Sequence, residues 1–228
     1  MINLLQHSMF EEVLFPSTKS QQSAKNTELC LRKHVRFQTH PAQNIKDSTW
    51  VIFDFETTGL DSSYDRIIEI GAQKIQNNVV IDQFESLIDI KQDLPNIVQK
   101  LSGITNKMLK GQPTIESILP QFLNFIEGSI LIAHNAAFDL GFLKAESYRQ
   151  GIDLTWSTLC SLKLARDLLP DLERKTLDAL ANYYELSFEA RHRSIGDVKV
   201  TKDVLENLLE NEGSYLKTWQ QFEPYRVE

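Results

Sequence analysis

The chain has 228 residues, of which 42% are hydrophobic and 24% charged, and its formal net charge is −7. This length allows one sizeable domain with short extensions, and the negative charge argues against a protein that grips duplex DNA through a broad basic face. The two cysteines give no disulfide framework, and no apolar run approaches the ~20 residues of a membrane span. We therefore expect a cytoplasmic protein without a membrane partner.

Composition divides the chain into four segments. An apolar peptide covers residues 1–15, and a flexible linker with a small basic patch covers residues 16–47. The main domain is expected over residues 48–213, and an aromatic segment follows over residues 214–228.

Regular hydrophobic patterning begins at Trp50, where the run WVIFDF predicts a buried strand over residues 50–55. Asn77 and Asn78 then predict a hairpin turn between two strands. The predicted elements that follow the first strand are strands at 66–75 and 79–88, a helix at 116–128, a strand at 129–134, and helices at 138–151, 161–169, 176–186 and 196–213. This order of strands and helices predicts an α/β fold, a mixed sheet covered by helices.

Two carboxylates end the first predicted strand. Asp54 and Glu56 are two residues apart, so they point to one face of the strand while Phe53 and Phe55 point to the other. Like charges this close repel unless a cation lies between them, and hard oxygen ligands suit Mg²⁺ or Mn²⁺. Taken alone, an Asp-x-Glu pair is a weak signal, and in most proteins it is a solvated strand end.

Two further acidic positions follow in the chain. Asp139 falls in the first turn of a predicted helix, where a carboxylate also stabilises the helix dipole. In the run RHRSIGDV, His192 stands five residues before Asp197. Each fragment by itself has an ordinary structural explanation, so only their combination points to a site.

In combination, these fragments resemble the motifs of the DnaQ-like DEDDh superfamily of exonucleases. The three matching runs are IFDFETTGL, LIAHNAAFDLGFL and HRSIGDV, in this order. The resemblance implies an RNase H-like mixed β-sheet flanked by α-helices over residues 48–213. A sister group carries tyrosine at the position of Arg193, so His192 places the chain in the histidine branch.

The resemblance also implies a reaction and the residues that perform it. The expected reaction is 3′→5′ exonucleolytic hydrolysis that releases nucleoside monophosphates with two bound Mg²⁺ (or Mn²⁺) ions. His192 is expected to accept the proton of the attacking water. The expected metal ligands are Asp54, Glu56, Asp139 and Asp197.

Residues near the first two motifs are candidates for holding the substrate. By the resemblance, Thr57 and Leu60 meet the terminal nucleotide, and Gly59, His134, Asn135 and Phe138 are further candidates. Three alternatives stay open: Gly59 supplies a turn with positive φ, Phe138 packs beneath its helix, and His134 is a hydrogen-bonded structural histidine.

The runs ETTGL and AHNAAFD resemble the proofreading (epsilon-type) exonuclease of bacterial DNA polymerase III, which favours a single-stranded DNA 3′ end as the substrate. Trimming of RNA 3′ ends with the same chemistry is one alternative. A non-catalytic module that binds a polymerase or a sliding clamp is another. The presence of all five expected catalytic residues argues against this last alternative.

Both ends of the chain carry candidate partner sites. Gln6, Met9 and Phe10 lie in a run, QHSMF, that resembles the short peptides that dock on bacterial sliding clamps. The alternative is an apolar start that packs on the domain. Near the other end, an aromatic stripe at helical spacing (Tyr215, Trp219, Phe222) predicts either core packing or a partner face.

Overall fold

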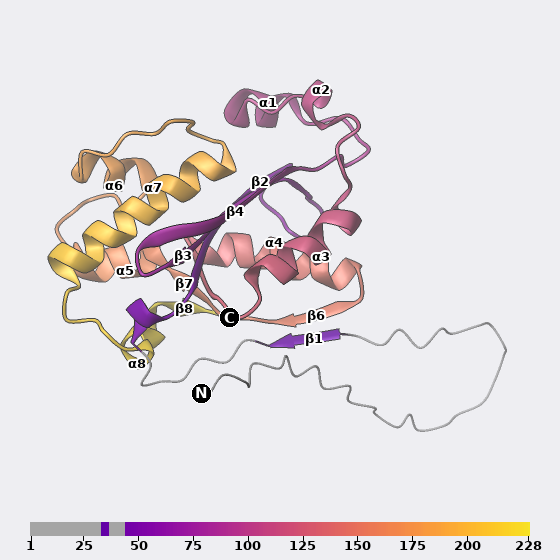
Figure 1. Cartoon of the computed structure of the whole chain (residues 1–228). Helices are drawn as coiled ribbons and strands as arrows, with labels where there is room; N and C mark the ends of the chain where they lie inside the picture. The colour runs from indigo at the N-terminus through magenta and orange to yellow at the C-terminus, as the bar shows by residue number, and fades with distance from the viewer. Residues whose placement is uncertain (1–32, 37–43) are drawn as a thin grey trace.

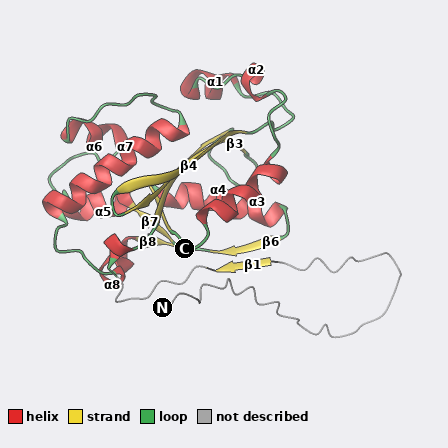
Figure 2. Cartoon of the chain, viewed as in Figure 1, coloured by secondary structure: helices red, strands yellow, loops and turns green. Residues whose placement is uncertain are grey.

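The structure, a computed structural model, describes residues 33–36 and 44–228 and contains a six-stranded mixed sheet between layers of helices (Figures 1 and 2). The strand order is β4-β3-β2-β5-β7-β8, in which β2, β5 and β7 are parallel and the others antiparallel to their neighbours. The strands are β2 (Trp50–Thr57), β3 (Ile67–Gln76), β4 (Val79–Leu87), β5 (Ile130–Ala133), β7 (Thr158–Cys160) and β8 (Arg226–Val227). The predicted α/β class is confirmed.

Helices cover both faces of this sheet. The helices are α1 (Asn96–Ser102), α2 (Asn106–Leu109), α3 (Ile115–Ile126), α4 (Ala136–Arg149), α5 (Ser161–Leu168), α6 (Leu177–Tyr183), α7 (Ser194–Asn207) and α8 (Trp219–Phe222). α3 and α4 pack on one face, α5, α7 and α8 pack on the other, and α6 packs on α5 and α7. Two further strands, β1 (Lys33–Arg36) and β6 (Ile152–Thr155), form a separate parallel pair.

The central strand β2 divides the core into two. Phe53 and Phe55 pack against Phe122 of α3 in the larger hydrophobic cluster. Asp54 and Glu56 point to the opposite face, under the start of α7, as the alternation predicted.

The predicted hairpin is confirmed, whereas some other elements differ from the predicted ones in where they begin or end. Asn77 and Asn78 have φ values of 52° and 61°, the left-handed conformation that a two-residue hairpin turn requires. Pro120 lies inside α3 without ending it. The final long helix begins at Ser194 rather than at residue 196 and changes to a π-helical turn over Leu208–Glu212. The short strands β6, β7 and β8 were not predicted, because two to four residues carry too little periodicity.

The C-terminal aromatic residues divide between the core and the surface. Trp219 and Phe222 are buried in the second hydrophobic cluster, whereas Tyr215 is exposed. The core-packing alternative therefore holds for two members of the stripe. The proposed clamp peptide with Gln6, Met9 and Phe10 lies outside the described residues, and the boundaries of the four segments stay predictions. Within the described part of the chain, no helix has the length and apolar character needed to cross a bilayer.

Candidate active site

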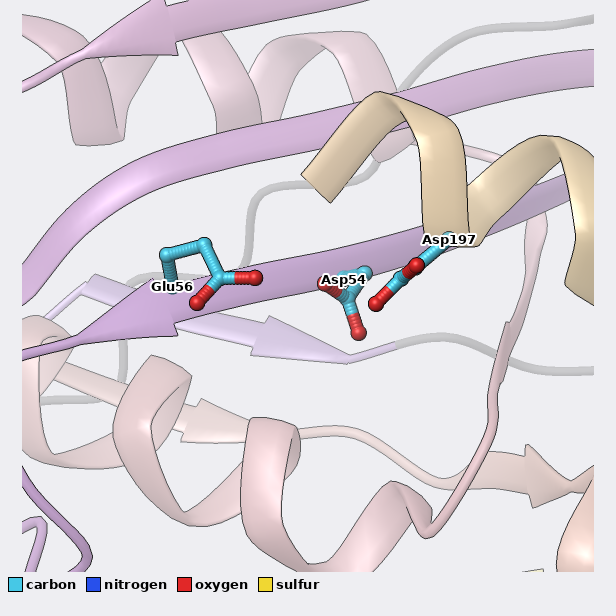
Figure 3. Close-up of side chains that lie close together, drawn as sticks. All are labelled: Asp54, Glu56 and Asp197. Atoms are coloured by element: carbon cyan, nitrogen blue, oxygen red, sulfur yellow. The ribbon is translucent and has the colours of Figure 1, made fainter. Parts of the chain in front are cut away.

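Three carboxylates from two elements meet at the end of β2. Asp54 and Glu56 lie on β2, and Asp197 lies in the first turn of α7 (Figure 3). One oxygen atom of each lies within 4.8 Å of the others. Residues 143 positions apart in the chain thus form one acidic cluster, which the sequence predicted from the motifs alone.

Two glycines allow α7 to reach the strands. Gly71 on β3 stands opposite Asp54 in the β2–β3 ladder, and a Cβ there would lie 2.5 Å from the backbone nitrogen of Ile195. A Cβ at Gly196 would lie 1.9 Å from the carbonyl oxygen of Ala190. Neither space admits a side chain. The first turn of α7 therefore lies directly on β3, which brings Asp197 to Asp54.

Glu69, also on β3, fixes the start of α7. Its buried carboxylate accepts hydrogen bonds from Nε of Arg193 at 2.9 Å and from the backbone nitrogen of Ser194 at 2.9 Å. The second bond satisfies one of the free N–H groups at the helix N-terminus. This role was not predicted from the sequence. The available signal was an acidic residue inside an otherwise apolar strand, because a buried charge needs a partner.

Asp139 approaches the cluster from the other side of β2. It lies in the first turn of α4, as predicted, and is buried. Its Oδ1 accepts a hydrogen bond from the backbone nitrogen of Phe55 at 3.1 Å. Asp139 is not part of the group of three oxygens described above, but its charge is one of the causes that raise the pKa of Asp54. The fourth predicted carboxylate is therefore adjacent to the other three.

Burial and mutual repulsion disfavour the charged form of all four carboxylates. Burial is the largest cause of the raised pKa of Asp54 and of Asp139, and neighbouring carboxylates add to it. The same two effects raise the pKa of Glu56 to about 7. Burial raises the pKa of Asp197 to about 6 although the Arg191 charge opposes it. A bound cation would reverse these shifts, because it favours the ionised carboxylates.

The guanidinium of Arg191 is a cation already present at the cluster. Its Nε and Nη2 donate to the two carboxylate oxygens of Asp178 at 2.6 and 2.9 Å, and its carbon lies 4.9 Å from the ring centre of Phe188. The remaining nitrogen, Nη1, donates to Oδ2 of Asp197. The role of this arginine was not predicted from the sequence, because the pairing with Asp178 arises only when α6 and α7 pack together.

The cluster fits a divalent metal ion. Its ligand atoms are carboxylate oxygens without a thiolate among them, which is the donor set of Mg²⁺ and Mn²⁺. In addition, Oδ1 of Asp197 is buried and has no hydrogen-bond partner. A buried carboxylate oxygen without a partner is costly, and a metal ion at this position would satisfy it.

His192 is close in the chain to Asp197, but its side chain is not part of the acidic cluster. Its side chain is exposed, its φ is 59°, and it does not belong to the group of carboxylates. Partial burial lowers its pKa, and the adjacent Arg191 charge lowers it further. The imidazole is therefore neutral at neutral pH, the form that accepts a proton.

Among the substrate candidates after β2, Gly59 has a different structural role from the one considered. Its φ is not in the left-handed region, so the positive-φ explanation is wrong. Instead, a Cβ there would lie 2.4 Å from Oδ2 of Asp65, which packs across the turn. Thr57 is partly buried, and its hydroxyl donates to the carbonyl oxygen of Gly59 at 2.6 Å. Leu60 is fully presented to solvent, with 87% exposure.

The candidates in the second motif have contacts inside the protein. Nδ1 of His134 is 2.9 Å from the Ser161 hydroxyl, and Nε2 is 3.0 Å from the Lys175 carbonyl oxygen. Because a carbonyl can only accept, Nε2 carries the proton, and burial lowers the pKa of His134 to about 4. Phe138 packs on the core with its ring 4.9 Å from that of Phe142. Asn135, exposed with φ 62°, precedes α4. These contacts favour the structural alternatives for His134 and Phe138.

Known proteins that are similar to this chain include exonucleases and DNA polymerases. The model of the family RNase_T, described as an exonuclease, matches residues 51–205. A DNA polymerase III of PolC type from Clostridium perfringens is 41% identical over 160 residues, which are 70% of this chain and 11% of that protein. The chain thus spans about a tenth of the PolC-type relatives that it matches.

In two further comparisons the match covers most of the length of the related protein. The DNA polymerase III subunit epsilon of Aquifex aeolicus is 34% identical over 169 residues, which cover 73% of this chain and 83% of the subunit. A structure of exonuclease X in complex with 5′-overhanging duplex DNA superposes with a TM-score of 0.63 and 24% identity, covering 77% of this chain and 99% of that one. The predicted RNase H-like fold is confirmed by this likeness.

Proposed function

The chain belongs to the exonuclease family RNase_T, and on that premise we propose that it is a 3′→5′ exonuclease that removes nucleotides from single-stranded DNA. The observation that carries the proposal is the acidic cluster of Asp54, Glu56 and Asp197 with Asp139 beside it. The relatives named as DNA polymerase III support DNA as the substrate, with proofreading as the role and a polymerase as the partner. A cytoplasmic location stays a prediction.

We assign two Mg²⁺ or Mn²⁺ ions to the four carboxylates Asp54, Glu56, Asp139 and Asp197. Two ions bound there would activate the attacking water and neutralise charge on the phosphate. The chain's own contribution is to hold these oxygens at one place through the packing of α7 on β3. His192 takes the proton from the water, for which its exposed ring must turn toward the cluster when the substrate binds.

Thr57 and Leu60 are proposed to contact the terminal nucleotide. Thr57 is the last residue of β2 and directly follows Glu56, and Leu60 lies three residues further on in the loop. The exposed Leu60 side chain offers an apolar surface to the terminal base. The roles predicted for Gly59, His134, Asn135 and Phe138 stay predictions, and the internal contacts of His134 and Phe138 count against direct contact with the substrate.

The proposal is tested by digesting single-stranded DNA labelled at its 5′ end with Mg²⁺ present, beside an RNA strand of the same sequence. We expect a ladder of products that shorten from the 3′ end, no activity in excess chelator, and none from Asp54→Ala. Release of the labelled 5′ nucleotide as the first product, or cleavage in chelator, would contradict the proposal. Faster digestion of RNA would favour the RNA-trimming alternative. Binding of DNA without any cleavage would favour the non-catalytic alternative.

A further inference from the structure

Two large apolar side chains stand in solvent on the loop that leaves β2. Leu60 is 87% exposed and Tyr64 is 84% exposed, the highest values among the large hydrophobic residues in the described part of the chain. Single exposed apolar side chains are ordinary. Two on one loop, directly after a carboxylate-bearing strand, are less so, and such groupings mark binding sites.

The backbone of this loop is held rigidly around Asp65. The Asp65 carboxylate accepts from the Thr58 hydroxyl at 2.8 Å and from the backbone nitrogen of Asp61 at 2.9 Å. The backbone nitrogen of Asp65 in turn donates to the Asp61 carbonyl oxygen at 2.7 Å. The Thr58 hydroxyl also accepts from the backbone nitrogen of Arg66 at 3.0 Å. The loop is therefore closed at its base and does not need to order itself when a ligand binds.

A buried carboxylate on α4 holds the tip of the same loop. Glu146 is fully buried and pairs with Arg66 at 2.7 Å and with Arg149 at 3.2 Å. Arg149 donates from Nη2 to the carbonyl oxygens of Ser62 and Ser63 at 2.7 and 3.0 Å. The protein thus uses a buried ion pair to fix the two residues that precede Tyr64. Fixed presentation of an exposed aromatic ring is the arrangement expected of a binding residue.

The loop also lies close to the acidic cluster. Thr58 is two residues after Glu56, and consecutive Cα atoms are about 3.8 Å apart, so their Cα atoms lie within about 8 Å. The Asp65 side chain contacts Thr58, and Tyr64 directly precedes Asp65. The Cα atom of Tyr64 therefore lies within roughly 20 Å of that of Glu56 by chain reach. Stacked bases are about 3.4 Å apart, so the bases just behind the terminal nucleotide fall in this range.

We propose that the Tyr64 ring stacks on an unpaired base of the substrate strand, one of the second to fourth bases from the 3′ end. This inference rests on the proposed function and deepens it. The stack requires an open base face, so Tyr64 makes the enzyme prefer single-stranded over fully paired ends. Stacking on an aromatic ring contributes to nucleic-acid affinity without adding positive charge to a chain whose net charge is −7.

The test compares two substrates. One is a single-stranded oligonucleotide, and the other is a p-nitrophenyl ester of thymidine 5′-monophosphate, which has no second base. We expect Tyr64→Ala to raise KM for the oligonucleotide about tenfold with kcat nearly unchanged, since one base stack is worth about 5- to 150-fold in affinity. KM for the ester stays the same. Tyr64→Trp restores tight binding of the oligonucleotide, and Tyr215→Ala, an exposed tyrosine elsewhere, has no effect.

An abasic scan identifies the base. Placing an abasic nucleotide at each of the second to fourth positions should weaken binding to the wild-type protein at one of them and leave Tyr64→Ala unaffected at that position. Equal oligonucleotide KM values for wild type and Tyr64→Ala would overturn the inference while leaving the exonuclease proposal standing. A wild-type protein that cleaves neither substrate would instead overturn the proposed function itself. Because Tyr64 is exposed, the variant should unfold at the wild-type temperature.

Discussion

The Arg191 guanidinium donates to the Asp197 carboxylate from a position that Asp178 and the Phe188 ring fix. One of the proposed metal ligands is thus paired with a cation that belongs to the protein itself. The Arg191 charge also lowers the pKa of Asp54 and of Glu56, against the larger effect of burial. Arg191 therefore neutralises part of the cluster, and a divalent ion that binds there has to share or displace it.

Arg191→Gln should bind Mn²⁺ more tightly, by about tenfold, or about 1.4 kcal/mol. The reason is that a unit positive charge next to the site repels a divalent ion. Isothermal titration of the protein with Mn²⁺ measures the change directly. Arg174→Gln, which removes an exposed arginine, is the matched control. Unchanged or weaker Mn²⁺ binding by Arg191→Gln would show that Arg191 positions Asp197 rather than competing with the ion.

In excess chelator, the stability of the protein should fall as the pH rises from about 4 to 7. The pKa of Glu56 is raised from 4.5 to about 7 and that of Asp197 from 3.8 to about 6. In this pH range the folded state holds protons that the unfolded chain has released. The two carboxyl groups therefore stabilise the folded state fully below their ordinary pKa values, and this stabilisation is lost once the pH exceeds the raised values. Urea unfolding at several pH values measures this slope. Asp54→Asn should flatten it, and Mg²⁺ should reverse its sign.

Gly196→Ala should destabilise the protein by about 1–3 kcal/mol and weaken Mn²⁺ binding. The new methyl group would overlap the Ala190 carbonyl oxygen, so the first turn of α7 has to move away and take Asp197 with it. Gly141→Ala is the control. Its nearest neighbour is the Ser62 hydroxyl at 3.6 Å, an ordinary contact, and an alanine inside α4 should add about 0.5–1 kcal/mol. Equal stability of the two variants would contradict the close packing of α7.

His192→Ala should lower kcat by about 10²–10⁴-fold, the usual contribution of a general base. Because the side chain is exposed and outside the acidic cluster, Mn²⁺ binding and the unfolding temperature should not change. The pKa of His192 is lowered, so the wild-type rate should rise through a midpoint below 6.5 and level off by neutral pH. Near-normal turnover by the variant would require a different base.

Gln6→Ala with Phe10→Ala should reduce digestion of primers loaded with a sliding clamp and leave digestion of short oligonucleotides unchanged. Both residues lie outside the described part of the chain, and the motive is their resemblance to clamp-docking peptides. A short peptide concentrates its affinity in a few anchors, so two substitutions suffice. If the unfolding temperature of the double variant is instead several degrees lower, the peptide packs on the domain. Leu4→Ala, between the terminus and the motif, distinguishes the two alternatives. It should lower the unfolding temperature if the peptide packs on the domain, and it should leave digestion of clamp-loaded primers unchanged if the peptide docks on the clamp.

Much of the site was predictable because its signals are local. The alternation of β2 placed Asp54 and Glu56 on one face, and helix periodicity placed Asp139 in a first turn. The motifs around these residues then identified the family. Each of these inferences needs only a few neighbouring residues, whose geometry is fixed by the regular repeat of the strand or helix.

The contacts that bring the site residues together could not be predicted from the sequence in the same way. Glu69 fixes the start of α7 from 125 residues away, and Gly71 leaves the space in which that helix meets β3. The Arg191–Asp178 pair and the exposed, fixed position of Tyr64 likewise depend on contacts between separate elements. The sequence determined which carboxylates and histidine the protein carries and which element holds each. Only the tertiary structure decided how close they come, because packing and buried charge pairing act between elements and leave no repeat along the chain.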